Sequence, residues 1–545
     1  MTFIKKYIWF SHQYCYIQGC GFIWNHYIMR FKNTEDQSKE LWFNDVFIYQ
    51  NYSDIPSRKE CSVNNWILKD VTLPIIAANM NAVSWKRMCE TLSRYWGLGI
   101  LPQDMNFETK LKIVQHIMSA SVEYDTPLRV TLKDNVWIAL DIINKKNHWC
   151  VVLVDDEWNA IWYYIESDLW KHDRFVQFEH IKPRSASKAS FYFECWEDWI
   201  TFKQTNWDSE LKWFKELYEY LLTEWEDNAF IYEAGKFQWI IYKKDIIRRT
   251  FFNDKSSFWF SHNLDKESTL LKRDLNVWIA IWINQVFDEK EFWHIQDYYN
   301  AWAKIFVIDT AHGFQEKMIK AIKKVRELPF WKDLTIIAWN VCTEEWTEAL
   351  IEAWANWVKV WIGPGAMCTT RMMTAVWRPQ FSAIVACSKV ANSMWWFVVA
   401  DWWIKYTRDF CLALAAWAKF VMIGTLLSWT KESVWEVKYD EKGLMFKVNY
   451  WMASSKAVLW RNQNQSLFDI SLKNTFNEGI STSRIYLRDW LSTTWEVCEK
   501  LVSWLKSSMT YVGARNLEEY QEKVIIWVQT QSWYNEGTPH WNLIK

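Results

Sequence analysis

The segment VWIGPGAMCTTRMMTAVWRPQFSAI, residues 360–384, holds the residues best suited to chemistry. A Gly-Pro-Gly turn at 363–365 brings backbone amides and carbonyls close to whatever binds beside it. Cys368 follows this turn, and a cysteine thiolate on such a loop can attack an electron-poor carbon and hold it covalently. The other ten of the 11 cysteines are interpreted as inert, buried side chains.

Short apolar runs that end in polar or turn residues recur along the chain and would position this loop. They cover residues 74–80, 97–103, 276–284, 304–313, 334–341, 357–365, 397–403 and 420–427. From the third run on, amphipathic stretches such as 315–328 and 344–355 separate them, which predicts β-α units and a parallel sheet. Eight such strands predict an α/β fold, a (β/α)8 TIM barrel, whose functional loops follow the carboxyl ends of the strands.

The spacing of the runs breaks once, where about 170 residues separate the second from the third, far more than one crossover helix needs. Within this gap, residues 125–169 and 212–247 repeat a pattern of helix, strand, turn, strand and polar helix start. The chain is therefore divided into an N-terminal extension (1–28), a first barrel part (29–122), an insertion (123–250) and the remaining barrel with its catalytic loop and flap (251–545). The insertion is expected to project from the barrel, because loops tolerate added chain.

Composition excludes several classes of protein. The chain has 63 Lys+Arg against 64 Asp+Glu, so nothing in its charge calls for nucleic acid or an anionic membrane. It has no run of 18 apolar residues and no signal-peptide core. The scattered cysteines form no CxxC pair, which favours a reduced, cytoplasmic chain without a zinc site.

Tryptophan is unusually frequent in this chain. There are 44 Trp and only 13 Gly in 545 residues, where ordinary usage has Gly near 7%. The tryptophans stand where turns favour glycine, as at Trp158, Trp339, Trp361, Trp402 and Trp403, although a Cβ-bearing ring fits a left-handed turn poorly. The hypothesis is that many of these codons, UGA in particular, are read as glycine in the native source; the alternative is a truly Trp-rich protein.

Residues 360–384 resemble, nearly residue by residue, the active-site loop of the IMP dehydrogenase/GMP reductase family, and the resemblance covers about residues 40–540. It implies a purine-nucleotide oxidoreductase in which Cys368 attacks C2 of the base and forms a covalent thioimidate. Thr370 and Glu478, the latter in NEGIST (477–482), are the implied catalytic partners of the cysteine.

The same resemblance implies the binding residues. Those for the nucleotide are Asn79, Met80, Asp401, Trp402, Trp403, Gly424, Thr425, Tyr450, Trp451 and Met452. Those for the dinucleotide cofactor, NADP(H) or NAD(H), are Asp309, Asn340, Trp361 and Gly363. Backbone carbonyls of Gly363, Gly365 and Cys368 would hold a monovalent cation, which is typically potassium in relatives. Relatives have glycine at 402 and 403, where the Trp rings would crowd the nucleotide phosphate.

Two reactions share this scaffold. GMP reductase converts GMP and NADPH to IMP, ammonia and NADP, whereas IMP dehydrogenase converts IMP, NAD and water to XMP and NADH. Residues 457–479 lack the Arg-Tyr pair of the dehydrogenase flap, and no arginine follows Tyr450, so the sequence favours the reductase. IMP dehydrogenase is the alternative, and a catalytically dead scaffold that senses nucleotides is a second one.

The resemblance also suggests partners. The repeated patterns at 125–169 and 212–247 look like a pair of CBS modules, which would bind an adenine nucleotide. Relatives form tetramers, so a homotetramer is expected, with GMP or IMP as small-molecule substrates and no membrane or nucleic acid involved. Residues 1–28 precede the first family-like segment and are interpreted as an extension or an incorrect start.

Overall fold

The computed structural model describes twenty stretches of the chain. These are residues 29–65, 67–68, 71–120, 125–145, 150–157, 160–181, 192–195, 218–219, 221–223, 228–233, 236–243, 246, 276–361, 363, 365, 368–401, 404–434, 438–449, 483–486 and 493–537. The proposed extension at 1–28 lies outside them.

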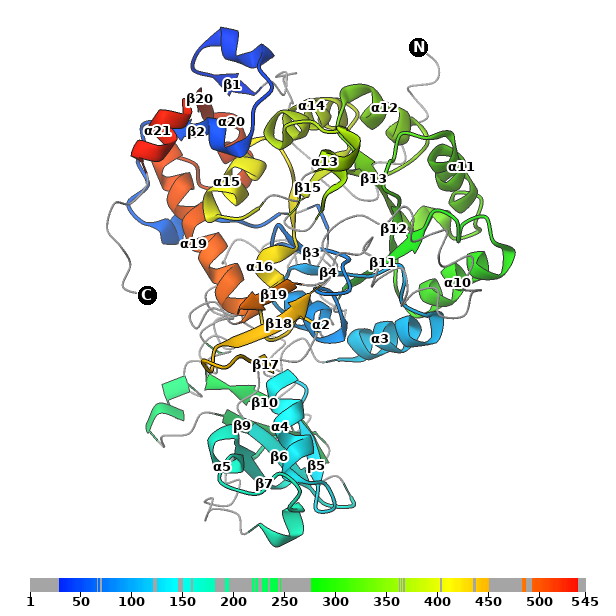
Figure 1. The fold of residues 1–545 in the computed structure, drawn as a ribbon, viewed down its shortest axis with the longest axis vertical. Helices are drawn as coiled ribbons and strands as arrows, with labels where there is room; N and C mark the ends of the chain where they lie inside the picture. The colour runs from blue at the N-terminus through cyan, green and yellow to red at the C-terminus, as the bar shows by residue number, and fades with distance from the viewer. Residues whose placement is uncertain are drawn as a thin grey trace.

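Eight parallel strands close into a barrel in the order β11-β12-β13-β14-β15-β16-β3-β4 (Figure 1). They are β3 (Ile75–Ala77), β4 (Leu98–Leu101), β11 (Val277–Trp282), β12 (Ile305–Asp309), β13 (Thr335–Val341), β14 (Trp357–Val360), β15 (Phe397–Asp401) and β16 (Phe420–Ile423). Almost every strand residue is buried, because inward side chains fill the barrel and helices cover the outward ones. The predicted TIM barrel is confirmed, and each of the eight predicted runs contains one of these strands.

Helices form the outer layer of the barrel (Figure 1). They are α2 (Lys86–Arg94), α3 (Phe107–Ser119), α10 (Glu289–Asn300), α11 (Glu316–Val325), α12 (Glu344–Glu352), α14 (Gln380–Ser393) and α15 (Thr407–Ala415). Two short helices, α13 (Thr370–Thr374) and α16 (Thr425–Ser428), lie in the loops that follow β14 and β16. The predicted helical stretches 315–328 and 344–355 are confirmed as α11 and α12. Asp288 and Thr343 accept backbone N–H bonds at the first turns of α10 and α12, which explains where these helices begin.

The two ends of the described chain meet in one small sheet. Its strands β1 (Arg30–Phe31), β20 (Ile525–Val528) and β2 (Val46–Tyr49) lie in that order, beside α19 (Thr494–Val512), α20 (Leu517–Lys523) and α21 (Gln531–Glu536). A third sheet contains β17 (Lys438–Tyr439), β18 (Met445–Asn449) and β19 (Ser483–Tyr486). Short 3-10 helices cover Thr34–Ser38, Phe43–Asp45, Arg58–Glu60, Phe178–His180 and Trp331–Asp333.

The insertion projects from the barrel and contains two sheets of the same topology (Figure 1). The first holds β5 (Arg129–Thr131), β6 (Cys150–Val154) and β7 (Ala160–Ile165), with α4 (Val136–Lys145) and α5 (Glu166–Leu169); the second holds β8 (Tyr192–Cys195), β9 (Asn228–Glu233) and β10 (Lys236–Tyr242). In each, the first pairing is parallel and the second antiparallel. The two units thus repeat one strand arrangement, in line with the predicted repeat; their identity as CBS modules stays a prediction.

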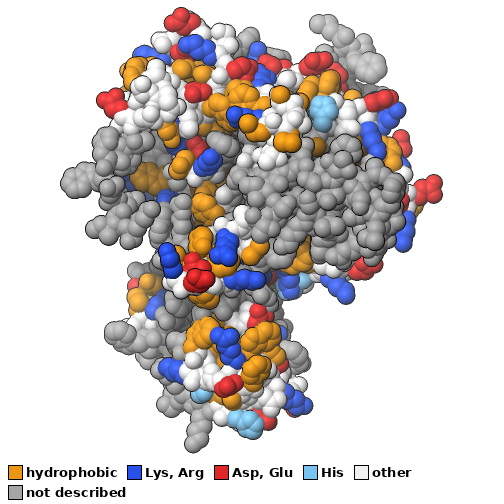
Figure 2. Space-filling view, viewed as in Figure 1, with side chains coloured by type: hydrophobic (Ala, Val, Ile, Leu, Met, Phe, Trp, Pro, Cys, Tyr) orange, Lys and Arg blue, Asp and Glu red, His pale blue; other side chains and the backbone are white. Residues whose placement is uncertain are grey.

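The surface of the described residues is mixed in charge. Figure 2 shows Lys and Arg interspersed with Asp and Glu over both the barrel and the insertion, as a net charge of -1 leads one to expect. Within the described stretches, the search for a helix that could span a bilayer finds none.

Five of the six non-glycine residues with positive φ in the described chain are tryptophans, and each directly follows a helix C-cap. They are Trp96, Trp302, Trp354, Trp395 and Trp417, with φ between 60° and 77°. At the end of α2, the N–H of Trp96 donates to Ser93 O at 3.1 Å and that of Gly97 to Leu92 O at 3.0 Å. This is the pair of hydrogen bonds that ends a helix with a left-handed glycine, and the other four helices repeat it.

A glycine takes the same place at the end of α19. Gly513 has φ 75°, and the N–H groups of Gly513 and Ala514 donate to Thr510 O and Met509 O. The five tryptophans therefore adopt the backbone of a glycine, which supports the recoding hypothesis. The prediction that Trp339 and Trp361 stand in left-handed turns is wrong, because neither has a positive φ: Trp339 is a residue of strand β13, and Trp361 directly follows β14. Trp158, Trp402 and Trp403 lie outside the described residues.

Replacing each of these five helix-ending tryptophans with glycine is expected to raise the free energy of unfolding by about 1 kcal/mol, because an L-residue in the left-handed region costs about 1–2 kcal/mol. Chemical denaturation of the recombinant chain measures the effect. The control is Trp504→Gly, in the interior of α19 and 53% exposed, which is expected to destabilise the chain because glycine is a poor helix former. Peptide sequencing of the native protein should find glycine at the five positions, and tryptophan there would refute the recoding.

Candidate active site

The predicted site residues that the structure describes lie at the carboxyl ends of the barrel strands. Asn79 and Met80 follow β3, Asp309 ends β12, Asn340 lies near the end of β13, Trp361 and Gly363 follow β14, Asp401 ends β15, and Gly424 and Thr425 follow β16. Because all eight strands are parallel, these ends meet at one mouth of the barrel. The structure thus places at one face residues that are up to about 350 positions apart in the chain.

Cys368 lies in the loop between β14 and α13, close to the first residue of this short helix. Its Sγ is 3.1 Å from Oγ1 of Thr370, so the two predicted catalytic side chains are in contact. Of the eight cysteines whose side chains the structure describes, seven are buried and Cys368 is partly exposed. Burial raises the pKa of Cys342 to about 11 and those of Cys387 and Cys411 to about 12, which makes these thiols poor nucleophiles.

Gly363 gives the loop a turn that other residues would not tolerate. Its φ is +84°, and a Cβ at this position would lie 2.9 Å from the carbonyl oxygen of Val376. The turn therefore needs glycine at position 363 for two reasons: the positive φ, and the close approach of this residue to the chain that follows α13. Neutral backbone carbonyls, such as those of Gly363, Gly365 and Cys368, are chemically suited to a monovalent cation. Within the described stretches no cluster of His, Cys, Asp or Glu could hold a metal ion.

A chain of buried amides and carboxylates crosses the barrel mouth. The Asn79 Nδ2 group donates to Gln103 Oε1 at 2.9 Å and to Asp309 Oδ2 at 3.1 Å. Burial raises the pKa of Asp309 to about 6, although the nearby Lys359 ammonium and the Asn79 bond act in the opposite direction. A buried carboxylate that keeps acceptor capacity is suited to bind hydroxyl groups of a ligand.

Lys359 is a buried lysine that the sequence analysis did not single out. It lies in β14, its side chain is fully buried, and its Nζ donates to Oδ2 of the equally buried Asp401. Burial lowers the pKa of Lys359 to about 8, and the charge of Asp401 counteracts that effect. Its signal in the sequence was a single cation between Val358 and Val360, inside an apolar strand. An isolated charge there requires a buried partner.

Two further contacts fit bound ligands. Gly424 lies so close to Met80 that a Cβ would stand 3.2 Å from the Met80 sulfur, so two residues predicted to bind the nucleotide are neighbours. Asn340 donates through Nδ2 to Thr310 O at 3.2 Å, while its buried Oδ1 has no hydrogen-bond partner among the described residues. An unpaired buried acceptor near Asp309 fits a donor group of a dinucleotide, such as a ribose hydroxyl.

Comparison with known proteins identifies the family to which this site belongs. Residues 40–540 match the IMP dehydrogenase / GMP reductase domain. The chain belongs to the IMP dehydrogenase/GMP reductase family. It is 34% identical over 513 residues to a GMP reductase of Mycobacterium tuberculosis, covering 94% of this chain and 99% of that protein. It is 31% identical over 511 residues to an inosine-5'-monophosphate dehydrogenase of Aquifex aeolicus, covering 93% and 96%.

Solved structures confirm the fold of this oxidoreductase family. A GMP reductase of Trypanosoma brucei with one cysteine replaced by alanine, solved in complex with guanosine 5'-monophosphate, superposes with a TM-score of 0.59 at 23% identity. The superposition covers 94% of this chain and all of that one. At this identity the likeness supports the architecture alone. It covers barrel and insertion together, as the family match does.

Several predicted site residues lie outside the described stretches. They are Trp402, Trp403, Tyr450, Trp451, Met452 and Glu478. Their roles stay predictions from the family resemblance. What the described residues do show is that strand β18 leads toward 450–452: Lys447, on this strand, is buried and donates to Thr430 O at 2.8 Å and Ser433 O at 3.0 Å. It thereby ties β18 to the chain that follows α16.

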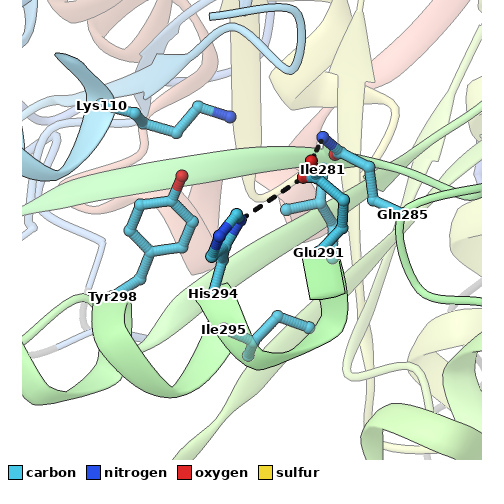
Figure 3. Close-up of a pocket in the computed structure, with 7 residues that line it drawn as sticks. All are labelled: Lys110, Ile281, Gln285, Glu291, His294, Ile295 and Tyr298. Atoms are coloured by element: carbon cyan, nitrogen blue, oxygen red, sulfur yellow. Dashed lines mark hydrogen bonds and ion pairs between the residues drawn. The ribbon is translucent and has the colours of Figure 1, made fainter. Parts of the chain in front are cut away.

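A small cavity lies outside the barrel mouth, between α3, α10 and β11 (Figure 3). Its volume is about 10 Å³, and it is lined by Lys110, Ile281, Gln285, Glu291, His294, Ile295 and Tyr298. That is room for about one water molecule, so it is no nucleotide site. Lys110 links it to the mouth, because its Nζ donates to Ala280 O at 3.0 Å and approaches Gln103 O at 3.4 Å.

Lys359→Met is expected to lower the free energy of unfolding by about 3–5 kcal/mol at pH 8, because it leaves Asp401 buried without its cation. In the variant, burial without the cation raises the pKa of Asp401 above its value in the unfolded chain. The variant therefore loses stability as pH rises between these two pKa values, and its difference from wild type shrinks toward pH 5. Urea unfolding at the two pH values measures it. The double variant Lys359→Met/Asp401→Leu should recover most of the loss; equal instability of both variants would contradict the assignment.

Asp309→Asn is expected to stabilise the unliganded protein at pH 8 by an amount on the order of 1–3 kcal/mol. The pKa of Asp309 is about 6 in the fold against a model value of 3.8, so folding favours the protonated acid. Wild-type stability therefore falls as pH rises between about 4 and 6, and the variant lacks this fall. Unfolding curves at pH 4 and pH 8 should converge at the lower pH; a constant difference would contradict the assigned pKa.

Proposed function

We propose that this protein is a GMP reductase, which converts GMP and NADPH to IMP, ammonia and NADP. The observation that carries the proposal is the 34% identity to the M. tuberculosis GMP reductase over nearly the whole of both chains, insertion included. The absence of a dehydrogenase-type Arg-Tyr pair from residues 457–479 supports the same reaction.

Cys368 performs the covalent step. Its thiolate attacks C2 of GMP, and the C2–N bond then breaks, so that ammonia leaves and C2 remains bound to sulfur as a thioimidate. Thr370, whose Oγ1 lies 3.1 Å from the sulfur, is close enough to take part in proton transfer to the amine that leaves C2. Glu478 is proposed to protonate the leaving amine together with Thr370. NADPH, held beside Asp309 and Asn340, would supply the hydride that C2 takes up as the C2–S bond breaks, which would release IMP and the Cys368 thiolate.

The barrel mouth orients the nucleotide. Asp401 accepts hydrogen bonds from the ribose hydroxyls, and Lys359 keeps this buried carboxylate ionised and fixed. Asn79 and Met80 pack against the nucleotide. The amides of Trp402, Trp403, Gly424 and Thr425 receive the phosphate, and Tyr450, Trp451 and Met452 complete its binding. A buried carboxylate is a strong acceptor for neutral hydroxyl donors, which suits a sugar.

The cofactor binds beside Asp309 and Asn340, with Trp361 and Gly363 next to it. Asp309 accepts from the ribose hydroxyls, and the free Asn340 Oδ1 accepts a further donor. Potassium, held by the carbonyls of Gly363, Gly365 and Cys368, would order the loop that carries the nucleophile. The insertion is proposed to be a CBS pair that binds an adenine nucleotide, and the assembly a homotetramer.

IMP dehydrogenase is the second candidate, favoured by the 31% identity to the A. aeolicus enzyme over a similar length. In that reaction the same Cys368 adduct forms from IMP by hydride loss to NAD, and water then hydrolyses it. A water-activating base is required, and the residues that supply it would differ from Glu478. A nucleotide-sensing scaffold without catalysis is the third candidate, and it becomes the better one if the tryptophans at the mouth are real; the centre of the Trp339 ring lies 3.1 Å from Lys359 Nζ.

The test uses the full chain with glycine at positions 96, 302, 354, 395, 402, 403, 417 and 451, in potassium buffer. NADPH absorbance is expected to fall with GMP, one ammonia being released per cofactor, and no NADH should form from IMP and NAD. Cys368→Ser should lower the rate by at least about 1,000-fold, and Glu478→Gln by about 100-fold. Formation of NADH from IMP would contradict the reductase, and inactivity with both pairs would favour the scaffold.

A further inference from the structure

Gln380 bridges the two strand ends that carry the proposed nucleophile loop and the proposed ribose carboxylate. It is the first residue of α14, and its side chain is 1% exposed. Its Nε2 donates to Val360 O and to Asp401 O, each at 2.8 Å. Val360 is the last residue of β14, directly before the loop that contains Cys368, and Asp401 is the last residue of β15.

The ladder between these strands ends where Gln380 binds. Its final pair is Val360 with Ala400, after which β14 runs into the Cys368 loop and Asp401 pairs with Met422 on the other side. A single carboxamide thus replaces the hydrogen bonds that the ladder no longer supplies. Both of its contacts are carbonyl oxygens, so the NH2 group must face them, since the flipped amide would set Oε1 against two acceptors.

The start of α14 is itself fixed, so that Gln380 acts from a rigid base. Two residues earlier, Arg378 donates to Cys342 O at 2.7 Å and forms hydrogen bonds of 2.8–3.2 Å with both carboxylate oxygens of Glu40. The first anchor lies beyond β13 and the second in the N-terminal segment. The carboxamide is therefore held from outside the two strands that it joins.

We propose that Gln380 is a positioning residue, which sets the distance between the Cys368 loop and Asp401 and so aligns the thiol with C2 of a bound purine nucleotide. The role in alignment rests on the proposed function, whereas the role in holding the two strand ends does not. Gln380 touches neither reacting atom, and it acts through the two carbonyls. A displacement of about 1 Å in such an arrangement can cost about 100-fold in rate.

Gln521 provides a matched control on the same barrel. It is buried to 3% exposure, and its Nε2 also bridges two backbone carbonyls, of Leu414 at 2.9 Å and of Ala418 at 3.0 Å. Those carbonyls lie before β16, at the opposite, amino-terminal end of the strands. Loss of its bonds should affect stability and leave the site aligned.

The experiment compares Gln380→Met and Gln521→Met in the full chain by two readouts. The first is hydrogen exchange followed by mass spectrometry. Gln380→Met should speed exchange at least about 10-fold in residues 361–374 and 401–405, which Gln521→Met should leave unchanged. Unchanged exchange there in Gln380→Met would overturn the proposal, whatever the activity of the protein.

The second readout is the labelling of Cys368 by 2-chloroinosine monophosphate, in which the thiolate displaces chloride from C2. Gln380→Met should lower the rate at saturating nucleotide about 10- to 100-fold, with labelling by iodoacetamide within twofold of wild type. If Gln380→Met slowed labelling by iodoacetamide as much as labelling by the nucleotide, or if Gln521→Met slowed nucleotide labelling equally, the effect would be a general structural one and the alignment role would be overturned. If the wild-type protein is not labelled by the nucleotide while the exchange result holds, the proposed function fails and the bridging role stands.

Gln380→Glu adds a pH-dependent readout, which is not expected if the side chain at this position contributes only by packing. A carboxylate cannot donate to the two carbonyls, whereas the protonated acid donates one hydrogen bond. Burial raises the pKa of such an acid, so its deficit in nucleotide labelling relative to wild type should shrink as pH falls from 8 to 6. A deficit that is the same at both pH values would contradict donation by this side chain.

Discussion

Lys359 and Asp401 form an ion pair that is buried at the mouth of the closed barrel, and the arrangement of the mouth depends on this interaction. Charges in such a place persist only when each has a partner. Lys359 lies near two carboxylates: its charge acts to lower the pKa of Asp309 against the larger effect of burial, and the charge of Asp401 acts to raise the pKa of Lys359. The cation thus holds together the carboxylate proposed for the nucleotide and the one proposed for the cofactor.

Further hydrogen bonds join the strand ends around the mouth. Asp309 accepts from Asn79, Asn79 also donates to Gln103, and the backbone of Asp401 accepts from Gln380. The set joins strands that the chain separates by up to 230 residues. Cys368 and Thr370 lie beyond β14, on the chain that leaves the strand that carries Lys359. The proposed nucleophile therefore lies in the loop that directly follows the strand carrying Lys359.

The architecture could be predicted from the sequence, because strands buried on both faces leave near-continuous apolar runs, and eight of these are visible. The Cys368 loop could be identified because its residues are adjacent in the chain. Lys359, Gln103 and Gln380 could not be assigned in this way, since their partners come from other strands and only closure of the barrel brings them together. The contact between Asn79 and Asp309 has the same origin. The sequence predicted glycine-type turns at other tryptophans, and only the backbone φ angles show that five tryptophans at helix ends adopt the left-handed conformation.

The proposed mechanism requires that Cys368 form a covalent bond to C2 of GMP and expel ammonia before any reduced cofactor is needed. Peptide mass spectrometry of the glycine-restored protein, incubated with GMP alone and quenched in acid, tests this directly. The account predicts a modification on Cys368 with the mass of GMP less one ammonia, and ammonia in the supernatant in equal amount. An unmodified Cys368 with GMP, together with an adduct that appears only with IMP and NAD, would contradict it.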